Sequence, residues 1–373
     1  MFARTRLLSD GFCLALGGVL CLLTAGCGYF ERCAEERHVI SRKDTPPRKV
    51  VLGTVVNSLW GEPTEPEVRL EVVCRLIDEV AAEAERKYPE DGLDLIVLPE
   101  EVLTAGSLAP PAEKALPLQG RVLETFAAKA REHDTYLIVP LALADDPEKG
   151  VYSNAAPLID RDGNLVGIYR KYHPVSYPGT DDLEGGITPG AEFKVFDCDF
   201  GRLGIQICWD MSYRDGWAEL ARKGAEIVAW PSAAPQTMLP RARALENHYY
   251  IVSSTPQDNA SVFEPSGLIA AQVKPPQRVL VHRVDLSYMV LPWSQQLRGG
   301  KGFTRLFGDR VGYHWSDTEL SGTFWSNDPE TTIGEMAEKL GVLEFHEEVE
   351  RSRRLQEAAR EGGSAKFEGR RAK

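Results

Sequence analysis

Several features that would place this chain in a familiar class are missing from its sequence. No repeat recurs at a fixed period and no long low-complexity tract is present, which excludes solenoid and fibrous architectures. A basic surplus is missing too, since the formal net charge is -12 at pH 7. That charge argues against nucleic acid as a partner and predicts no attraction to anionic lipid.

Cysteine is also scarce, with 7 in 373 residues, and no pair of cysteines has the spacing of metal ligands. A chain of this length with so few cysteines is not a disulfide scaffold. We therefore expect neither a cross-linked framework nor a cysteine metal site. Hydrophobic residues make up 43% of the chain, enough for one large core of about 250–300 residues.

The N-terminus has the pattern of a targeting segment. Arg4 and Arg6 precede an apolar run over residues 11–23, which is too short to span a bilayer comfortably. Residues 23–27 then read Leu-Thr-Ala-Gly-Cys, which resembles a bacterial lipoprotein box. The sequence predicts a signal peptide over 1–26, with Cys27 acylated and becoming the mature N-terminus. An ordinary cleaved signal, with Cys27 incidental, is the alternative.

The predicted place of the protein follows from that segment. Acyl chains on Cys27 would hold it to a membrane of the cell envelope, facing the periplasm or the exterior. Residues 27–49 are polar and charged, which predicts a tether between the lipid and the folded domain. No stretch after residue 26 is long and apolar enough to span a bilayer.

The body of the chain alternates strand and helix patterns, which indicates an α/β layer fold. A continuous apolar run over 93–98 is typical of a strand buried on both faces. The expected strands are 50–56, 93–98, 136–143, 227–230, 250–254 and 268–273, with two more flanking a turn at 160–164. The expected helices are 67–87, 121–133, 211–223 and 241–248.

The stretch around Cys208 is the most informative. Apolar residues alternate over 203–207, which predicts a strand that ends at Cys208, and Asp210 can cap a helix over 211–223. The N–H groups and dipole of that helix would favour a reactive thiolate. The other interpretation is a small buried hydrophobic residue, because free cysteine is often buried.

Two further strand ends carry charged residues. Glu100 follows the buried 93–98 run, in a setting that can raise its pKa toward that of a general base. Lys171 closes another strand. Carboxyl ends of strands are where α/β sheets bind ligands, so a base, a cation and a thiol could meet there. When each residue is considered alone, the commoner interpretation of Glu100 is a solvated loop carboxylate, and that of Lys171 is a surface charge.

Together these residues resemble the carbon–nitrogen hydrolase (nitrilase) superfamily over about residues 50–286. The stretches that carry the resemblance are Leu98–Glu100, Tyr169–His173, Gly204–Asp210, Arg243–Asn247 and Asp258–Ser261. Their order and spacing also match the family. The resemblance implies a four-layer α-β-β-α sandwich over residues 50–290 and a catalytic triad of Glu100, Lys171 and Cys208.

The same resemblance implies roles for three neighbours of the triad. The backbone N–H of Trp209 would join Lys171 in stabilising an oxyanion. A second glutamate of the family corresponds most nearly to Glu184, although a solvated loop acid is the alternative there. Glu101 is a rival to Glu100 as the base. No metal or organic cofactor is implied.

The chemistry expected is thiol-dependent cleavage of a non-peptide carbon–nitrogen bond. Glu100 would take the Cys208 proton, and a thioester would form and be hydrolysed. The Trp209-Asp210 pair resembles amidase-type members, so a linear amide or carbamoyl compound is the expected substrate. Nitrile hydrolysis, N-acyl transfer by the same triad and a catalytically silent binding protein are the alternatives.

Two expectations concern assembly and the C-terminus. Relatives usually pair subunits, and Tyr213, Trp217 and Leu220 would give helix 211–223 an apolar stripe for a homodimer contact or for packing on the sheet.

Residues 291–373 match nothing assignable and form a partly helical extension. In it, a helix start is expected at 328–330, a charged helix over 343–360 and a disordered tail from 362.

Overall fold

A computed structural model describes residues 42–57, 65–107 and 109–362 of the chain. The predicted signal peptide, Cys27 and most of the predicted tether lie outside these residues. Within them, no helix has both the length and the apolar character needed to cross a membrane.

The first sheet has seven strands in the order β13-β1-β2-β3-β5-β4, with β6 also pairing with β5. These strands are β1 Lys49–Val55, β2 Leu95–Val97, β3 Tyr136–Ile138, β4 Leu141–Asp146, β5 Val151–Ile159, β6 Leu165–Arg170 and β13 Val279–Asp285. β1 is parallel to β2, and β2 is parallel to β3. Their carboxyl ends therefore open on one edge, where Glu100 follows β2.

The second sheet has six strands in the order β12-β11-β10-β9-β8-β7. They are β7 Val195–Cys198, β8 Gly201–Ile205, β9 Ile227–Pro231, β10 Tyr250–Ser254, β11 Ala260–Phe263 and β12 Ile269–Val273. Leu52 and Leu95 of the first sheet share one buried cluster with Leu203 and Val252 of the second. The two sheets therefore pack face to face.

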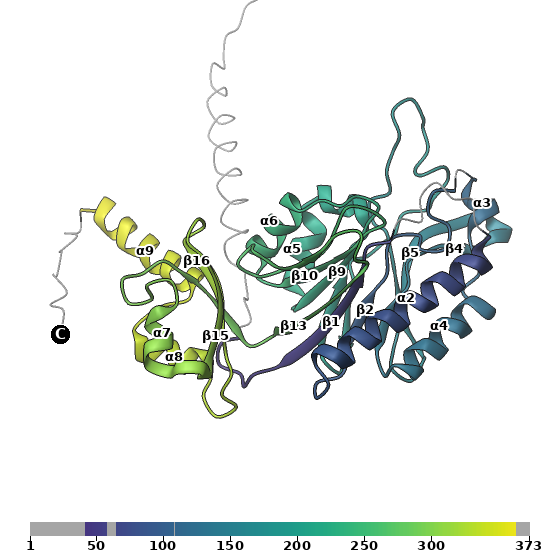
Figure 1. Cartoon of the computed structure of the whole chain (residues 1–373). Coiled ribbons are helices and arrows are strands. Elements are labelled where there is room, and N and C mark those ends of the chain that lie inside the picture. Colours follow the sequence, from purple (N-terminus) through teal and green to yellow (C-terminus); the bar gives the residue numbers. More distant parts are fainter. Residues whose placement is uncertain (1–41, 58–64, 108, 363–373) are drawn as a thin grey trace, which may run out of the picture. The chain divides into compact units, whose positions relative to one another are not determined.

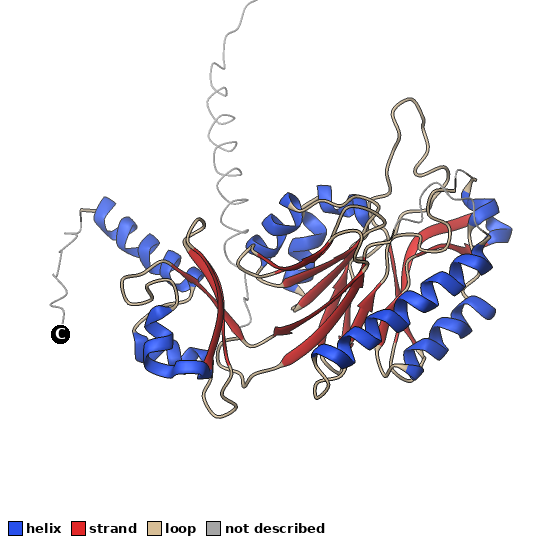
Figure 2. Cartoon of the chain, viewed as in Figure 1, coloured by secondary structure: helices blue, strands red, loops and turns tan. Residues whose placement is uncertain are grey.

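Helices cover the outer face of each sheet (Figures 1 and 2). α2 (Pro66–Lys87) and α4 (Arg121–Glu132) cover the first sheet, and α5 (Asp215–Arg222) and α6 (Met238–Asn247) cover the second. On the first sheet α2 lies so close that a Cβ on Gly53 would stand 2.4 Å from Val80. The expected four-layer α-β-β-α sandwich is confirmed.

One predicted strand is longer than expected and interrupted. The expected strand 136–143 is divided into β3 and β4, which pair in turn with the same strand, β5. The break falls at Val139-Pro140, because proline has no N–H to donate to the ladder.

The helix expected over 211–223 is also different. A 3-10 turn, η2 (Cys208–Ser212), comes first, and α5 begins only at Asp215. Trp217 and Leu220 are buried against the second sheet, while Tyr213 lies before the helix and is exposed. The apolar stripe expected on this helix therefore packs inward, and these residues do not form an outward contact surface.

Residues 42–49, the last part of the predicted tether, pack on the folded body. Arg42 Nη2 donates to the carbonyl of Ala225 at 2.7 Å, and Arg48 Nη1 lies 2.7 Å from Glu226 Oε1. Because both side chains reach the start of β9, this segment is held in place before β1 begins.

A third sheet, which the sequence did not predict, joins the last residues of the predicted hydrolase domain to the C-terminal extension. β14 (Tyr288–Pro292), β16 (Ser321–Ser326) and β15 (Val311–Ser316) form three antiparallel strands with a separate apolar core. The helices around them are α7 (Lys301–Phe307), η3 (Gly308–Arg310), α8 (Ile333–Leu340) and α9 (Phe345–Arg360). Two short helices elsewhere are α3 (Pro111–Lys114) and η1 (Pro147–Lys149).

The expected helix start at 328–330 is wrong. α8 begins at Ile333, after Thr332, whose hydroxyl accepts from the Glu335 N–H while the Glu335 carboxylate accepts from the Thr332 N–H. This reciprocal capping box stabilises the helix start better than Pro329 in a first turn would. The charged helix expected over 343–360 is present as α9.

Candidate active site

Cys208 occupies a strained corner between β8 and α5. The chain stays extended through Ile207 and turns at Cys208, whose φ of 41° lies in the left-handed region that non-glycine residues rarely adopt. The indole N–H of Trp230 donates to the Cys208 carbonyl at 3.1 Å and helps hold the corner. Such strain is typically retained at functional positions.

The structure brings Glu100, Lys171 and Cys208 together. Lys171 directly follows β6, and its Nζ lies 2.9 Å from Glu100 Oε1. Both side chains are buried, with exposed fractions of 7% for Glu100 and 2% for Lys171. Cys208 lies close enough to both that the charges of Glu100 and Lys171 act on the pKa of its thiol. A carboxylate, an ammonium and a thiol thus share one buried site.

Glu184 belongs to the same cluster. Its Oε1 lies 2.5 Å from Lys171 Nζ and accepts from the Val175 N–H at 2.9 Å. The Glu184 backbone has a φ of 49°, and it sits in the long connection between β6 and β7. Lys171 therefore bridges two carboxylates.

Glu101, the rival to Glu100, faces another partner. Its Oε2 lies 2.7 Å from Lys114 Nζ, and its φ is 46°. Burial raises the pKa of Glu101 even though Lys114 opposes that shift. Because its carboxylate is engaged by Lys114, the geometry favours Glu100 over Glu101 as the base.

Asn154 is a site residue that the sequence reasoning missed. Its Nδ2 donates to Glu100 Oε1 at 2.8 Å and to Glu184 Oε2 at 3.2 Å. Its backbone carbonyl accepts from the Lys171 N–H at 2.8 Å. It lies inside β5, where an asparagine gives no sequence signal for catalysis. Only the pairing of β5 with β6 places it beside both carboxylates.

The charges at the site fix the state of the carboxylate and the ammonium. Burial alone would raise the pKa of Glu100, but the Lys171 charge and hydrogen bonds from Lys171, Asn154 and Cys208 outweigh it and lower that pKa. Burial would lower the pKa of Lys171, but Glu100, Cys208 and Glu184 hold it well above its usual value. The expectation that the setting of Glu100 raises its pKa is therefore wrong.

The expected thiolate at Cys208 is wrong as well. Burial, followed by the negative charge of Glu100, raises the pKa of Cys208 to about 12, and Lys171 only partly opposes this. The helix dipole does not compensate, since α5 starts at Asp215. At neutral pH the site therefore holds a protonated thiol next to an ionised base.

A short turn after β9 contacts the base. The Ala233 N–H donates to Glu100 Oε2 at 2.8 Å. The same N–H and the Ser232 hydroxyl act to lower the pKa of the Cys208 thiol, against the larger effect of burial. Glu100 thus has Lys171 on one oxygen and the turn on the other, which fixes its orientation toward the sulfur.

Asp210 does not cap the following helix as expected. It is completely buried, and its carboxylate reaches back to accept from the Ile207 N–H at 2.9 Å and from the His173 N–H at 2.8 Å. Trp209, between Cys208 and Asp210, has a side chain that is 41% exposed. Asp210 therefore fixes the turn that carries the nucleophile and the Trp209 backbone.

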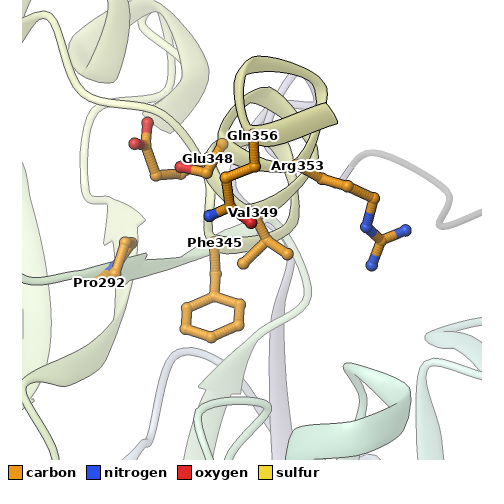
Figure 3. Close-up of a pocket in the computed structure, with 7 residues that line it drawn as sticks. Pro292, Phe345, Glu348, Val349, Arg353 and Gln356 are labelled. Atoms are coloured by element: carbon orange, nitrogen blue, oxygen red, sulfur yellow. The ribbon is translucent and has the colours of Figure 1, made fainter. Parts of the chain in front are cut away.

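Two cavities in the described part of the chain lie away from this cluster. One, of about 390 Å³, runs beside α9 and is shown in Figure 3. Its lining residues are Pro292, Phe345, Glu348, Val349, Ser352, Arg353 and Gln356. The other, of about 120 Å³, includes Lys49, His282 and Trp325. Neither contains Glu100, Lys171 or Cys208, so neither is the candidate active site.

One group among the described residues has metal-ligating side chains within reach of each other, namely Asp78, Glu132 and His133. It lies on α2 and α4, outside the first sheet. Lys129 Nζ stands 2.6 Å from Asp78 Oδ1 and 2.8 Å from Glu132 Oε2. The lysine ammonium supplies the positive charge there, so the group carries no argument for a metal.

Comparisons with known proteins identify the family of this chain. The family model described as carbon-nitrogen hydrolase matches residues 64–291. Omega-amidase NIT2-B of Xenopus laevis is 27% identical over 241 residues, 59% of this chain and 84% of that protein. Human deaminated glutathione amidase is 27% identical over 262 residues, 60% of this chain and 79% of its own length.

Solved structures share the fold. Nit3 of Saccharomyces cerevisiae, described as a member of branch 10 of the nitrilase superfamily, superposes with a TM-score of 0.53 at 22% identity. A carbon-nitrogen hydrolase of Helicobacter pylori gives a TM-score of 0.55 at 22% identity. Each match covers 64% of this chain and 90% of the other.

Proposed function

This chain belongs to the carbon–nitrogen hydrolase family and is an amidase-type hydrolase of C–N bonds, and from that premise we propose that it cleaves a small linear amide or carbamoyl compound through a thioester on Cys208. The observation that carries the proposal is the buried pair of Glu100 and Lys171, whose charges both act on the Cys208 thiol. Relatives named as omega-amidase and deaminated glutathione amidase support an amide substrate.

In the first half of the reaction Glu100 acts as the general base. The thiol proton moves to the Glu100 carboxylate while the sulfur attacks the amide carbon. Glu100 then returns that proton to the departing amine, which leaves the acyl group on Cys208 as a thioester. Because Glu100 is held ionised and the thiol is held protonated, the transfer starts from the correct protonation states.

In the second half water takes the place of the amine. Glu100 removes a proton from water, the resulting hydroxide attacks the thioester, and the proton returns to the Cys208 sulfur as the acid leaves. Lys171 and the Trp209 N–H stabilise the oxyanion in both halves, and losing one such donor typically costs about 10²–10³ in rate. Glu184 holds Lys171 in position for this role.

The test is mass spectrometry of the intact protein after incubation with panels of amides, carbamoyl compounds and nitriles. We expect an added acyl mass on Cys208 with amides, loss of that mass on adding water-competing hydroxylamine, and no adduct in Cys208→Ala. Full amide hydrolysis by Cys208→Ala would refute the nucleophile. An amine acceptor that consumes the adduct faster than water would identify an N-acyltransferase instead.

We further propose that the protein is lipid-anchored in the cell envelope through Cys27. The support is the sequence alone, in the basic start, the short apolar run and the Leu-Thr-Ala-Gly-Cys stretch at 23–27. Fractionation should find the wild type with membranes and Cys27→Ala released from them. Wild-type protein found wholly in the cytosol would refute the anchor.

A homodimer is the assembly we propose, with the α6 side of the second sheet as the contact. Large apolar side chains are exposed there, including Met238 at 81% and Leu245. Met238→Glu should halve the mass measured by light scattering, whereas the exposed Leu165→Glu on β6 should not. A monomeric wild type would refute the dimer.

A further inference from the structure

The C-terminal part of the chain has the opposite charge from the rest. Residues 351–373 carry eight arginine and lysine side chains and three glutamates, whereas the whole chain has a formal net charge of -12. The expectation of no attraction to anionic lipid rests on that total. Because attraction to a charged surface falls off within about 10 Å at 0.1 M salt, the local charge decides how this part of the chain behaves near a membrane.

α9 presents the first part of this basic segment to solvent. None of its residues is buried, and it lies beside the three-stranded sheet (Figure 1). Arg351 and Arg353 each pair with a glutamate three residues earlier. Among the described residues, no carboxylate forms an ion pair with Arg354 or Arg360, and both arginines are exposed. Their guanidinium groups are therefore available to an anionic partner.

Large apolar side chains are exposed on and beside the same helix. Leu355 is 58% exposed, and Val349, which lines the cavity shown in Figure 3, is 39% exposed. Trp293, which is 56% exposed, directly follows Pro292 of the same cavity lining. Exposed leucine and tryptophan beside unpaired arginines are typical of a surface that lies at the boundary between lipid headgroups and acyl chains.

The segment that precedes the first sheet reaches the folded body beside this helix. Lys43 Nζ lies 2.8 Å from Glu347 Oε1 in the first turn of α9, and the Lys43 carbonyl accepts from the Gly334 N–H of α8 at 2.9 Å. Residues 28–41 connect this point to Cys27, the proposed site of the lipid. A tether that starts beside α9 would raise the effective concentration of even a weak contact between α9 and the bilayer.

We propose that α9 is a docking surface for an anionic lipid bilayer. Arg354 and Arg360 attract the anionic headgroups, and the basic residues that follow α9 in the sequence add to that attraction. Leu355 and Trp293 add apolar area that is removed from water at the interface. Acyl chains on Cys27 would hold the protein to any membrane, whereas α9 distinguishes anionic from neutral lipid and sets which side of the protein faces the bilayer.

The test is flotation of the protein with vesicles of phosphatidylcholine and with vesicles that also contain phosphatidylglycerol. The chain is used from residue 28, so that no acyl group takes part, and it keeps all four apolar cores, which lie between Val50 and Phe345. We expect binding to the anionic vesicles only, and its loss at high salt. Equal binding to both kinds of vesicle, or binding that salt does not weaken, would overturn the proposal.

A matched pair of charge reversals separates α9 from the net charge. Arg354→Glu and Arg121→Glu change the net charge equally, but Arg121 is an exposed residue at the start of α4, on the outer face of the first sheet. Arg354→Glu should weaken binding to the anionic vesicles by about 25-fold, since each positive charge near such a surface contributes about fivefold. Arg121→Glu should bind as the unchanged chain does. An equal loss in the two variants would overturn the proposal.

A second pair tests the apolar contribution. Leu355→Gln should weaken binding by about 5–10-fold, because the leucine leaves water when α9 docks. Leu165→Gln, at an exposed position of β6, should have no effect. Wild-type binding by Leu355→Gln would overturn the proposal. So would a dimer that forms without lipid and that Leu355→Gln converts to a monomer, because a second copy of the chain would then occupy this face.

The failure of this inference and of the proposed anchor can be told apart. If the wild type is found with membranes but residues 28–373 ignore anionic vesicles, the docking surface is refuted and the anchor on Cys27 stands. If the wild type is wholly cytosolic and residues 28–373 bind anionic vesicles with the losses given above, the docking surface is supported and the anchor is refuted. Neither result depends on amide hydrolysis.

Discussion

The phenol of Tyr169 donates a 2.8 Å hydrogen bond to Oδ2 of Asp210. Tyr169 lies in β6 of the first sheet, two positions before Lys171, and Asp210 lies in the turn of Cys208 next to the second sheet. Both side chains are completely buried. This bond therefore links the sheet that carries the cation to the turn that carries the nucleophile.

The first prediction concerns that link. Tyr169→Phe leaves Asp210 Oδ2 with the Ile207 N–H as its one remaining hydrogen-bond donor in the described part of the chain, so we expect a loss of about 1–3 kcal/mol in the free energy of unfolding. The kcat should fall while KM changes little, because the turn that carries Cys208 is no longer hydrogen-bonded to the strand that precedes Lys171. Chemical denaturation and steady-state kinetics measure the two effects. Wild-type stability would show that the bond between the sheets is dispensable.

The second prediction separates the acidity of the thiol from catalysis. Glu100→Gln removes a charge that raises the pKa of Cys208, so the thiol should titrate below its value of about 12, closer to an ordinary cysteine. Hydrolysis should nevertheless fall by about 10²–10⁴, because the general base is gone. Thiolate absorbance against pH, with Cys208→Ala as the blank, tests this. An unchanged or raised thiol pKa would contradict the prediction.

The third prediction concerns Lys171→Ala. Removing the ammonium leaves two carboxylates buried without their cation, which typically costs about 3–5 kcal/mol at neutral pH, and activity should be lost. In the wild type the lowered pKa of Glu100 contributes stability above pH 4.5 that is lost only as pH falls through its folded pKa.

In the Lys171→Ala variant the sign reverses. Burial without Lys171 raises the Glu100 pKa above 4.5, so the variant loses stability as pH rises through that range. The stability gap between the variant and the wild type should therefore widen from pH 4 to pH 7 in thermal melts. A gap that stays constant with pH would show that the ion pair is not what the variant loses.

The fourth prediction compares two glutamates. Glu184→Gln should lower kcat by about 10-fold or more, because the carboxylate holds Lys171 at 2.5 Å. Glu101→Gln should leave kcat within about threefold, because Glu101 pairs with Lys114 and does not reach the thiol. An equal loss of kcat in the two variants would reopen the choice between Glu100 and Glu101 as the general base.

The fifth prediction concerns Asn154→Ala. The asparagine hydrogen bond lowers the pKa of Glu100, so its loss should move the acid limb of the kcat/KM profile to higher pH. The activity lost near pH 5 should return in part as pH rises. A flat loss across the whole profile would indicate a structural defect instead. Asn164→Ala, in the exposed turn between β5 and β6, is the control.

Much of the sandwich could be predicted because its elements have strong local patterns. The strand at 250–254 and the helix near 67–87 coincide with β10 and α2, since their apolar spacing matches the buried faces. The three strand ends carrying Glu100, Lys171 and Cys208 also meet as expected. Local sequence pattern and the rule for strand ends predict the elements and their shared edge, and the family resemblance assigns the three residues to one triad.

Properties that depend on distant contacts could not be predicted. The pKa of Cys208 depends on burial and on the Glu100 charge, so reasoning from the helix dipole alone gave the wrong direction for the pKa shift. Asn154 carries no motif and acts only through the pairing of β5 with β6. In the three-stranded C-terminal sheet only β15 alternates, whereas β14 is continuously apolar and β16 has no period of two, so the sheet was missed.

The pairing of the first strand with a late one affects the order in which the chain can fold. Arg48, beside β1, donates its N–H to Asp285 of β13, 237 positions later, and β1 pairs with β13 along its whole length. The first sheet therefore cannot close until most of the domain has been synthesised. During that time one edge of β1 has no partner strand, so the growing chain is open to pairing with the strands of other chains.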